Sequence, residues 1–234
     1  MRITFLSDTH NLHDQITKDL PGGDLIICAG DVTMDGYLQE MKNFCEWFDG
    51  LRNYDHKIWI GGNHEFCLQD FPTKASEYYT SYKDIHYLQD DWLYVGEEYE
   101  DLVKVYGSPW QVAFFNYAFN LPKGGWQLKE KWDAIPADTD ILVTHGPAFG
   151  MQDFNPLSPT PRNIGCELLI DRIKTIKPKI HVCGHIHPGY GHTFDGDTHF
   201  INASVLNQKY KYAHLPISVE WDKATNEMTI LQMG

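Results

Sequence analysis

The sequence predicts an α/β fold in which parallel strands are covered by helices. Near the N-terminus, apolar runs at 24–29 and 57–60 flank a stripe with three- and four-residue spacing, formed by Leu38, Met41, Phe44, Cys45, Phe48 and Leu51. This strand–helix–strand pattern normally places its two strands parallel and side by side. The run at 24–29 is apolar on both faces, as expected for a strand covered on both sides. In addition, five apolar runs stop at residues with metal-binding or catalytic side chains.

The remaining elements follow from the same patterns. Alternating or continuous apolar runs predict strands at 3–6, 24–29, 57–60, 102–106, 141–144, 178–183, 198–203, 217–221 and 228–231, and amphipathic stripes predict helices at 38–50 and 168–176. Residues 66–101 show no clean period, and short helices and loops are expected around 76–82. The aromatic residues within 114–119 and 126–132 are interpreted as either core or the wall of a substrate site. The loop at 148–163 carries Pro156, Pro159 and Pro161 and is predicted to be a surface flap.

Composition limits the classes of function. We expect a single domain over 1–234, because the 234 residues contain no repeat, linker or low-complexity tract. Five cysteines without a Cys-x-x-Cys pair favour a reducing compartment, and the absence of a signal-peptide pattern makes the cytoplasm the expected location. The formal charge of −13 argues against binding to a nucleic-acid duplex or an anionic membrane. The sequence does not indicate an oligomeric state.

Residues with coordinating side chains follow five of the predicted strands. They are Asp8 and His10, Asp31, Asn63 and His64, His145, and His185 and His187. Each has a structural alternative when taken singly, such as a cap, a turn residue or a loop histidine. In open α/β sheets, however, ligands bind beyond the carboxyl ends of parallel strands, so these side chains are predicted to converge. Gly184 is expected to release the chain into a turn that brings His185 and His187 into one pocket.

The donor set selects a metal chemistry. Two carboxylates, one amide and four imidazoles exceed the needs of one tetrahedral ion. They suit two mixed nitrogen and oxygen sites that share a bridging carboxylate, with cations about 3.5–4 Å apart. Imidazole binds divalent manganese, iron, zinc or nickel in preference to magnesium or calcium. We expect two such divalent transition-metal ions per chain, and manganese is the identity that we favour. Such a pair of cations would act on a phosphoester.

The same residues resemble a known family. Asp8-Thr9-His10, Gly30-Asp31, Gly61-Gly62-Asn63-His64-Glu65, Thr144-His145 and Gly184-His185-Ile186-His187 are similar to the five ordered motifs of the calcineurin-like metallophosphoesterase superfamily. More narrowly, the chain resembles the metallophosphoesterase-domain-containing branch, a group of class III phosphodiesterases. The segments that carry this resemblance are Gly107–Gln111, Phe119–Pro122, Asp140–Pro147, Gly184–Gly191 and Ile201–Ser204.

The resemblance implies a fold and a role for each motif residue. It implies a four-layer α/β/β/α sandwich of two mixed sheets flanked by helices, with residues 198–231 supplying part of the second sheet. By this likeness, one cation is bound by Asp8, His10 and His187, and the other by Asn63, His145 and His185, with Asp31 bridging. His64 would act on the phosphoryl group, Glu65 would orient His64 from behind, and a metal-bridging hydroxide would attack the substrate. Some members of the branch lack the histidine that matches His185 and are weak enzymes. This chain retains that histidine, so we expect it to be active.

The substrate is less constrained by the motifs. Trp110, Phe149 and Tyr190 follow or flank motif loops, where they would stack a nucleobase or pack the rim. Arg162 is the nearest cationic candidate for a phosphate, with a solvated surface residue as its alternative. The branch resemblance suggests a small phosphodiester, with cyclic nucleotides as candidates. A phosphomonoesterase on the same site and a non-catalytic metal-binding scaffold are the two alternatives.

Overall fold

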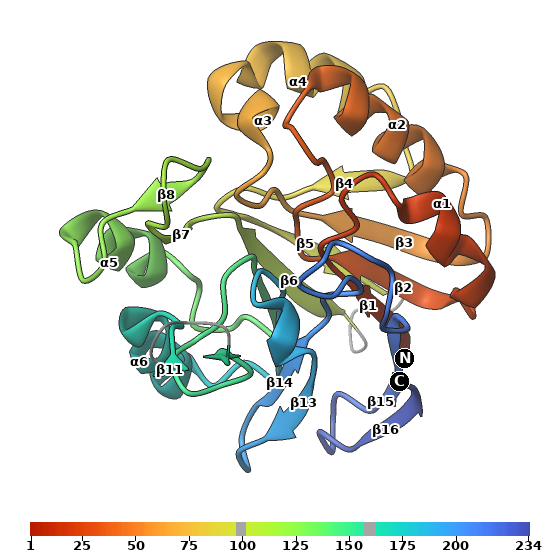
Figure 1. The fold of residues 1–234 in the computed structure, drawn as a ribbon. Coiled ribbons are helices and arrows are strands. Elements are labelled where there is room, and N and C mark those ends of the chain that lie inside the picture. Colours follow the sequence, from red (N-terminus) through yellow and green to blue (C-terminus); the bar gives the residue numbers. More distant parts are fainter. Residues whose placement is uncertain (97–101, 157–161) are drawn as a thin grey trace.

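Two six-stranded mixed sheets form the centre of the computed structural model, which describes residues 1–96, 102–156 and 162–234 (Figure 1). The first sheet has the order β16 (Met228–Gln232), β15 (Ile217–Trp221), β1 (Arg2–Leu6), β2 (Gly23–Cys28), β3 (Tyr54–Trp59) and β4 (Ile85–Tyr87). The second has the order β13 (Gly191–Phe194), β14 (His199–Asn202), β12 (Ile180–Cys183), β9 (Ile141–Thr144), β6 (Val103–Ser108) and β5 (Asp91–Val95). Strands β1 to β4 are parallel, as are β14, β12, β9 and β6.

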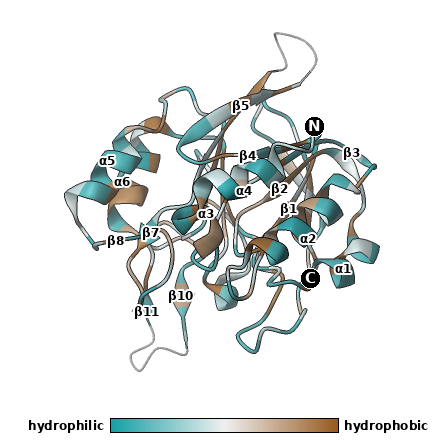
Figure 2. Cartoon of the chain, turned by 90° about the horizontal axis from the view of Figure 1, so that it is seen from above, coloured by the Kyte–Doolittle hydropathy of each residue, from teal (hydrophilic) through white to brown (hydrophobic). Residues whose placement is uncertain are grey.

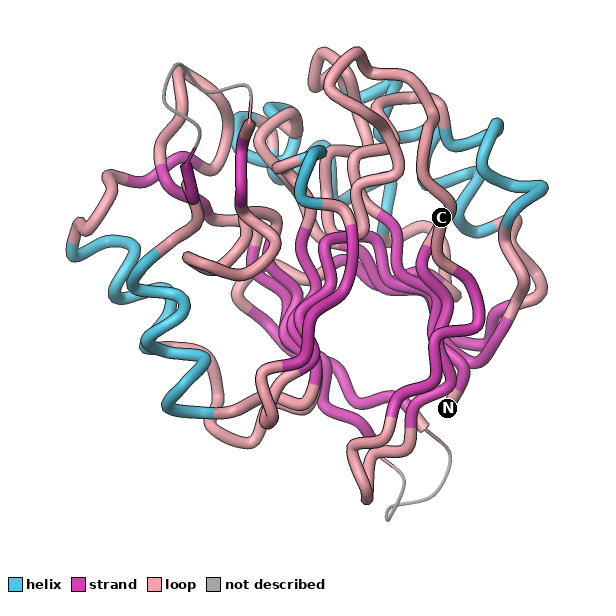
Figure 3. The backbone as a smooth tube through the Cα atoms, turned by 60° about the horizontal axis from the view of Figure 1, so that its bottom comes forward, coloured by secondary structure: helices cyan, strands magenta, loops and turns pink. Residues whose placement is uncertain are grey.

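Helices cover the outer face of each sheet. On the first sheet lie α1 (His13–Ile16), α2 (Leu38–Asp49), α3 (Phe66–Asp70) and α4 (Pro72–Tyr79), and on the second α5 (Trp126–Asp133) and α6 (Glu167–Ile176). Short 3-10 helices occur at η1 (Thr17–Asp19) and η3 (His187–Gly189), and two short strand pairs join β7 (Gln111–Val112) to β8 (Asn120–Leu121) and β10 (Phe154–Asn155) to β11 (Arg162–Asn163). Seen along the strands, the sheets form two adjacent layers with helices outside (Figure 3).

Strand alternation explains the layers. Ile3 and Phe5 of β1 point into a core that both sheets share, whereas Leu6 packs against the helices on the outer face. On the second sheet Val143 belongs to the shared core, and its neighbour Leu142 packs against α5 and α6. The helices carry both hydrophilic and hydrophobic stretches, as amphipathic elements on a sheet do (Figure 2). The predicted α/β/β/α sandwich is confirmed.

The structure departs from the predicted elements in two respects, and part of one predicted element is not described. The short strands β4, β5 and β13 were not predicted, because each has a polar or exposed face. Residues 198–231 do not all join the second sheet: β14 does, but β15 pairs antiparallel with β1 of the first sheet and β16 pairs with β15. Of the proline-rich loop, Pro159 and Pro161 lie outside the described residues.

The carboxyl ends of the parallel strands meet at one edge of the sandwich. Ser7, directly after β1, forms a parallel bridge with Ser204, directly after β14, so the two sheets join there. The backbone of Val205 donates to the carbonyl of Ser7 at 3.0 Å. This junction brings the loops after β1, β2 and β3 next to those after β9 and β12. In the described part of the chain, no helix combines the length and the apolar character that crossing a membrane requires.

Candidate metal centre

Several residues of the strand-end loops have a left-handed backbone. The φ angles are 56° at Asp8, 38° at His10, 52° at Asp31 and 65° at His185. Bulky side chains rarely adopt this region, although Asp, Asn and His enter it more often than most residues do. The loops after β1 and β2 hold each other in this form, because the backbone of His10 donates to the carbonyl of Asp31 at 3.1 Å. Strained residues therefore cluster at one edge of the fold, which is typical of functional sites.

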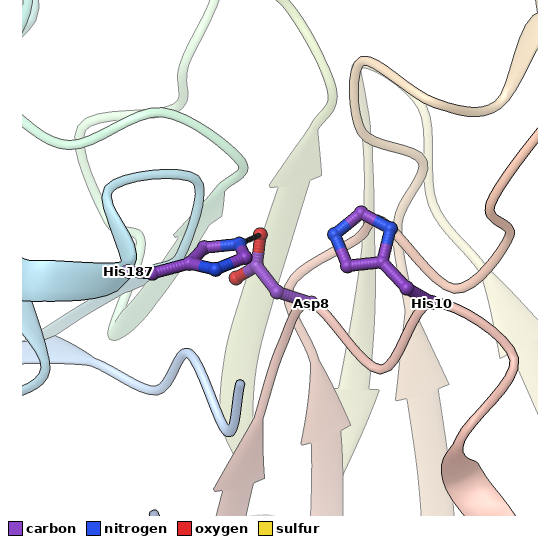
Figure 4. Close-up of side chains that lie close together, drawn as sticks. All are labelled: Asp8, His10 and His187. Atoms are coloured by element: carbon purple, nitrogen blue, oxygen red, sulfur yellow. Dashed lines mark ion pairs between the residues drawn. The ribbon is translucent and has the colours of Figure 1, made fainter. Parts of the chain in front are cut away.

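The first group of coordinating side chains joins the two sheets. Asp8 lies between His187 and His10, and the imidazole of His187 points at its carboxylate (Figure 4). The His187 Nε2 atom is 3.3 Å from Asp8 Oδ1. Ser204 donates its hydroxyl to Asp8 Oδ2 at 2.8 Å, which fixes the carboxylate from the second sheet. All three side chains are buried.

The second group surrounds the amide oxygen of Asn63. His185 Nδ1 is 2.7 Å and His145 Nε2 is 3.0 Å from Asn63 Oδ1. His145 Nε2 also lies 3.3 Å from Asp31 Oδ1. Four atoms that bind metals in other proteins, two oxygens and two nitrogens, therefore converge on one point.

Asp31 connects the two groups. Its Oδ1 faces His145, and its Oδ2 faces the Nε2 atoms of His10 at 3.7 Å and His64 at 4.0 Å. The backbone N–H of His64 donates to Asp31 Oδ1 at 2.9 Å. A carboxylate that presents one oxygen to each cluster has the geometry of a bridge between two cations.

Hydrogen bonds set the tautomers of four imidazoles. His10, His64, His145 and His187 each place Nδ1 on a backbone carbonyl, at distances of 2.9, 2.5, 2.8 and 3.0 Å. A carbonyl only accepts, so Nδ1 carries the proton, and Nε2 of the neutral ring keeps its lone pair for the centre. The Nε2 atom of His10 is buried and has no hydrogen-bond partner among the described residues. An orphaned nitrogen facing two carboxylates fits a divalent cation, so these residues fit a metal centre.

The carboxylates and imidazoles of the centre shift one another's pKa. Burial alone would lower the pKa of His145 and His187, but adjoining carboxylates, chiefly Asp31 for the first and Asp8 for the second, raise both to about 9. Burial lowers the pKa of His10 and of His185 to about 4. Although burial opposes their ionisation, the imidazoles hold the pKa of Asp8 and of Asp31 well below the usual range. The two carboxylates therefore require positive charge between them, which protons or metal cations supply.

Glu65 has a different role from the one expected. Its buried carboxylate accepts hydrogen bonds from the backbone of Asp31 and of Thr33, both at 2.9 Å, and of Gly62 at 2.5 Å. It does not bond to the His64 ring, which is held by the carbonyl of Met34. Burial, together with the charge of Asp31, raises the pKa of Glu65 to about 7. Glu65 therefore fastens the loop after β3 to the loop after β2, and the prediction that it orients His64 from behind is corrected.

Gly184 also acts differently from its prediction. Its φ is not in the left-handed region; the following residue, His185, makes the turn. Glycine is required here because a Cβ atom would overlap the Ser7 hydroxyl and the Asp8 carboxylate. The turn is held by Asn202, whose amide nitrogen donates to the carbonyl of Ile186 at 2.9 Å. The absence of a side chain at 184 lets the second sheet approach Asp8.

A cavity of about 770 Å³ lies beside the centre, with His185 in its wall. Three of the predicted substrate contacts, Trp110, Phe149 and Arg162, line it. Trp110 is held by its neighbours, since its Nε1 donates to Asp90 at 2.8 Å and Lys131 covers its ring at 4.5 Å from the centroid.

The fourth predicted contact, Tyr190, lies elsewhere. Its ring stacks on His214 with centroids 4.4 Å apart, and its hydroxyl donates to the carbonyl of Leu215 at 2.7 Å. Tyr190 packs against the core between the sheets and is not among the residues of the cavity wall. It is therefore not positioned for the substrate contact that we expected.

Aromatic side chains around the centre were not predicted individually. The Tyr210 ring lies 4.8 Å from the ring of His10, and the Tyr117 ring 5.1 Å from that of His64. Phe114, half exposed, approaches His185 edge-on at 6.2 Å and lines the cavity. The aromatic density of 114–119 was the available signal for two of them and agrees with the substrate-wall interpretation. Tyr210 follows no strand directly and had no such signal.

Comparison with known proteins gives consistent matches. Residues 1–189 match the model of the family described as calcineurin-like phosphoesterase. The chain is 37% identical over 235 residues to metallophosphoesterase domain-containing protein 1 of Homo sapiens and of Mus musculus, a match that covers 94% of this chain and 70% of each relative. The crystal structure of TT1561 of Thermus thermophilus aligns with a TM-score of 0.67 at 13% identity, over 100% of this chain and 97% of that one, which shows a shared fold.

Proposed function

Since the chain belongs to the calcineurin-like phosphoesterase family, as its motifs predicted, we propose that it is a dinuclear metal-dependent phosphodiesterase acting on small diesters. The observation that carries the proposal is the position of Asp31, with one carboxylate oxygen toward His145 and the other toward His10. This arrangement supports two cation sites that share one ligand. A site for a single cation would leave one of the two groups without a function.

The donor atoms assign the ligands as follows. One divalent cation would be held by Asp8, His10 and His187, the other by Asn63, His145 and His185, and both by Asp31. His185 presents Nδ1 to this centre, whereas the other three imidazoles present Nε2. When bound, the cations would supply Lewis acidity to the phosphoryl oxygens and a water of lowered pKa as nucleophile. Mixed nitrogen and oxygen donors suit manganese, which we favour.

His64 is proposed as the residue that acts on the phosphoryl group. Its Nε2 lies 4.0 Å from Asp31 Oδ2, slightly farther than the 3.7 Å of the His10 Nε2. Nδ1 is fixed on the carbonyl of Met34, and Nε2 is turned toward Asp31 and the proposed cation sites. From there it would stabilise charge on the phosphoryl group or protonate the leaving alkoxide.

A variant separates this role from that of a ligand. His64→Asn is expected to keep two Mn²⁺ per chain, measured by elemental analysis, while kcat for a diester with a poor leaving group falls by about 10²–10⁴-fold. The loss should be smaller for a p-nitrophenolate leaving group, which needs no proton. A variant that loses one metal instead would make His64 a ligand.

The cavity beside His185 supports a diester over a monoester. About 770 Å³ is within the range of small-molecule sites, and its wall combines aromatic rings with Arg162 and Lys123. In a diester two of the oxygens on phosphorus carry carbon, against one in a monoester, so the surroundings of the phosphorus must accommodate more apolar substrate. Cyclic nucleotides, whose base would enter this cavity, are the candidates that we favour. Five free, buried cysteines agree with a reducing compartment such as the cytoplasm.

The function is tested with one preparation and two substrates. Protein loaded with Mn²⁺ should hydrolyse bis(p-nitrophenyl) phosphate faster than p-nitrophenyl phosphate, and a panel of 2′,3′- and 3′,5′-cyclic nucleotides should contain a better substrate than either. A faster monoester reaction would favour the phosphatase alternative. Binding of two metals without turnover of any phosphoester would favour the metal-binding scaffold.

A further inference from the structure

One aromatic residue outside the motifs covers the metal centre on its solvent side. The ring of Tyr210 lies edge-on to His10 and to His187, with centroids 4.8 and 5.5 Å apart, and 6.3 Å from the ring of His64. The side chains of these three histidines are at most 11% exposed, whereas Tyr210 is 41% exposed. Tyr210 therefore lies between the centre and the solvent.

The backbone holds Tyr210 in this place at a cost. Its φ of 55° is in the left-handed region, which is unusual for a bulky aromatic residue. The turn that imposes this angle is built on Asn207: its carbonyl accepts the backbone N–H of Tyr210 at 2.9 Å, and its side-chain oxygen accepts that of Lys209 at 2.9 Å. The same Asn207 carbonyl accepts Nδ1–H of His187 at 3.0 Å. A proposed metal ligand and the tyrosine turn are thus fastened to one carbonyl oxygen.

The polar end of Tyr210 is available for a ligand. Within the ranges that the structure describes, no hydrogen bond engages its hydroxyl. A phenol is protonated at neutral pH and donates a strong hydrogen bond to a charged oxygen. The motif residues around the centre present acceptors and lone pairs to the cations, so they offer few N–H or O–H donors to a substrate anion.

We infer that the Tyr210 hydroxyl is an additional phosphoryl-binding group, which donates a hydrogen bond to a non-bridging oxygen of the bound phosphoester. The inference rests on the proposed function, because it places the phosphoryl group between the cation sites and the solvent. Tyr210 would contact the substrate from the side of His10 and His187, and it is not among the residues that line the cavity beside His185. The strained turn is then the means by which a residue distant from every motif reaches the phosphoryl group.

The test uses the full chain loaded with Mn²⁺ and three variants. Tyr210→Phe removes only the hydroxyl, Tyr210→Ala removes the ring, and Tyr94→Phe is the matched control, because Tyr94 is 43% exposed and lies on β5. Isothermal titration with inorganic phosphate measures anion affinity, titration with Mn²⁺ of the metal-free protein measures metal affinity, and bis(p-nitrophenyl) phosphate gives kcat and KM. Tyr210→Phe is expected to weaken phosphate binding and to lower kcat/KM by about 10- to 100-fold, as for one hydrogen bond to a charged group, with Mn²⁺ affinity unchanged.

Three results would overturn the inference. If Tyr210→Phe binds phosphate as tightly as the wild type, the hydroxyl does not contact the anion and the ring only shields the centre. An equal loss of Mn²⁺ affinity would show that Tyr210 acts through the ligands, and failure of the wild-type protein to bind phosphate would remove the site altogether. A wild type that binds phosphate but hydrolyses no diester would contradict the proposed function alone, since the phosphate titrations would still decide the role of Tyr210.

Discussion

The two sheets contribute different chemistry to the centre. The first sheet supplies every oxygen donor, namely Asp8, Asp31 and Asn63, together with one proposed imidazole ligand, His10. The second sheet supplies imidazoles only, namely His145, His185 and His187. Each proposed cation site draws on both sheets, so neither sheet alone holds a complete set of donors. The negative charge of the centre therefore belongs to the half of the fold built on the first sheet. The centre forms only when this half is packed against the half built on the second sheet.

The loops of the two halves are also held by opposite means. In the first sheet a carboxylate, Glu65, accepts backbone N–H groups of Asp31, Thr33 and Gly62. In the second an amide, Asn202, donates to the backbone carbonyl of Ile186. Glu65 lies in the half that carries the carboxylates, where burial and the charge of Asp31 raise its pKa to about 7.

The largest expected effect comes from removing the charge of Asp31, which faces imidazoles of both sheets. Asp31→Asn keeps the size of the side chain but cannot bridge two cations, because only one of its terminal atoms accepts. We expect kcat/KM for bis(p-nitrophenyl) phosphate to fall by more than about 100-fold, beyond the cost of losing an outer-shell partner, and bound Mn²⁺ to drop below two per chain. Asp55→Asn, on β3 of the same sheet and exposed, is the control. If Asp31→Asn retained two metals and its activity, the first sheet would not supply the bridging charge of the centre.

A smaller effect is expected from changing Glu65, which holds the loops after β2 and β3 of the first sheet together. Glu65→Gln replaces one acceptor oxygen by an N–H₂ group that faces a backbone donor, so the loop that carries Asp31 loses a hydrogen bond. Metal affinity and kcat/KM should each fall by about 10- to 100-fold, measured by Mn²⁺ titration and by diester hydrolysis. Glu220→Gln, exposed on β15, should change neither. If Glu65→Gln altered activity but left metal affinity intact, Glu65 would act on the substrate side instead.

The smallest effect concerns an imidazole of the second half outside the centre. Burial lowers the pKa of His181, on β12, to about 3. The unfolded chain takes up a proton near pH 6.5 while the folded chain stays neutral, so His181 contributes stability above that pH that is lost as the pH falls toward 3. His181→Gln should flatten the fall in unfolding free energy between pH 6 and 4 by up to about 1.4 kcal/mol per pH unit, measured by urea denaturation of metal-free protein.

The control for this effect is His56→Gln, on β3, which should keep the slope of the wild type. An unchanged slope in His181→Gln would mean that other groups carry the acid sensitivity. It would also leave no measured difference between His181, a buried imidazole outside the centre, and the proposed ligands of the second sheet.

The positions of the proposed metal ligands followed from the sequence because they depend on strand direction. Parallel strands end at one edge, so the residues after each apolar run had to meet there, and the structure brings them together. The roles of Glu65 and Gly184 did not follow, since they depend on which neighbouring loop lies within hydrogen-bond or contact distance. Tyr190 was misplaced for the same reason: its proximity to His187 along the chain says nothing of the side to which its ring turns. Tyr210 reaches the centre through the turn at Asn207, and the sequence pattern around that turn did not predict where the tyrosine ring would lie.

The left-handed residues of the strand-end loops have a consequence for the stability of the fold. Each such backbone angle costs of the order of 1 kcal/mol for a residue that carries a side chain. Asp8, His10, Asp31 and His185 all bear this cost, and glycine would relieve it at each position. The four side chains that the proposed centre uses are therefore also a source of backbone strain, and glycine at any one of these positions would relax the backbone and remove a proposed ligand in the same step.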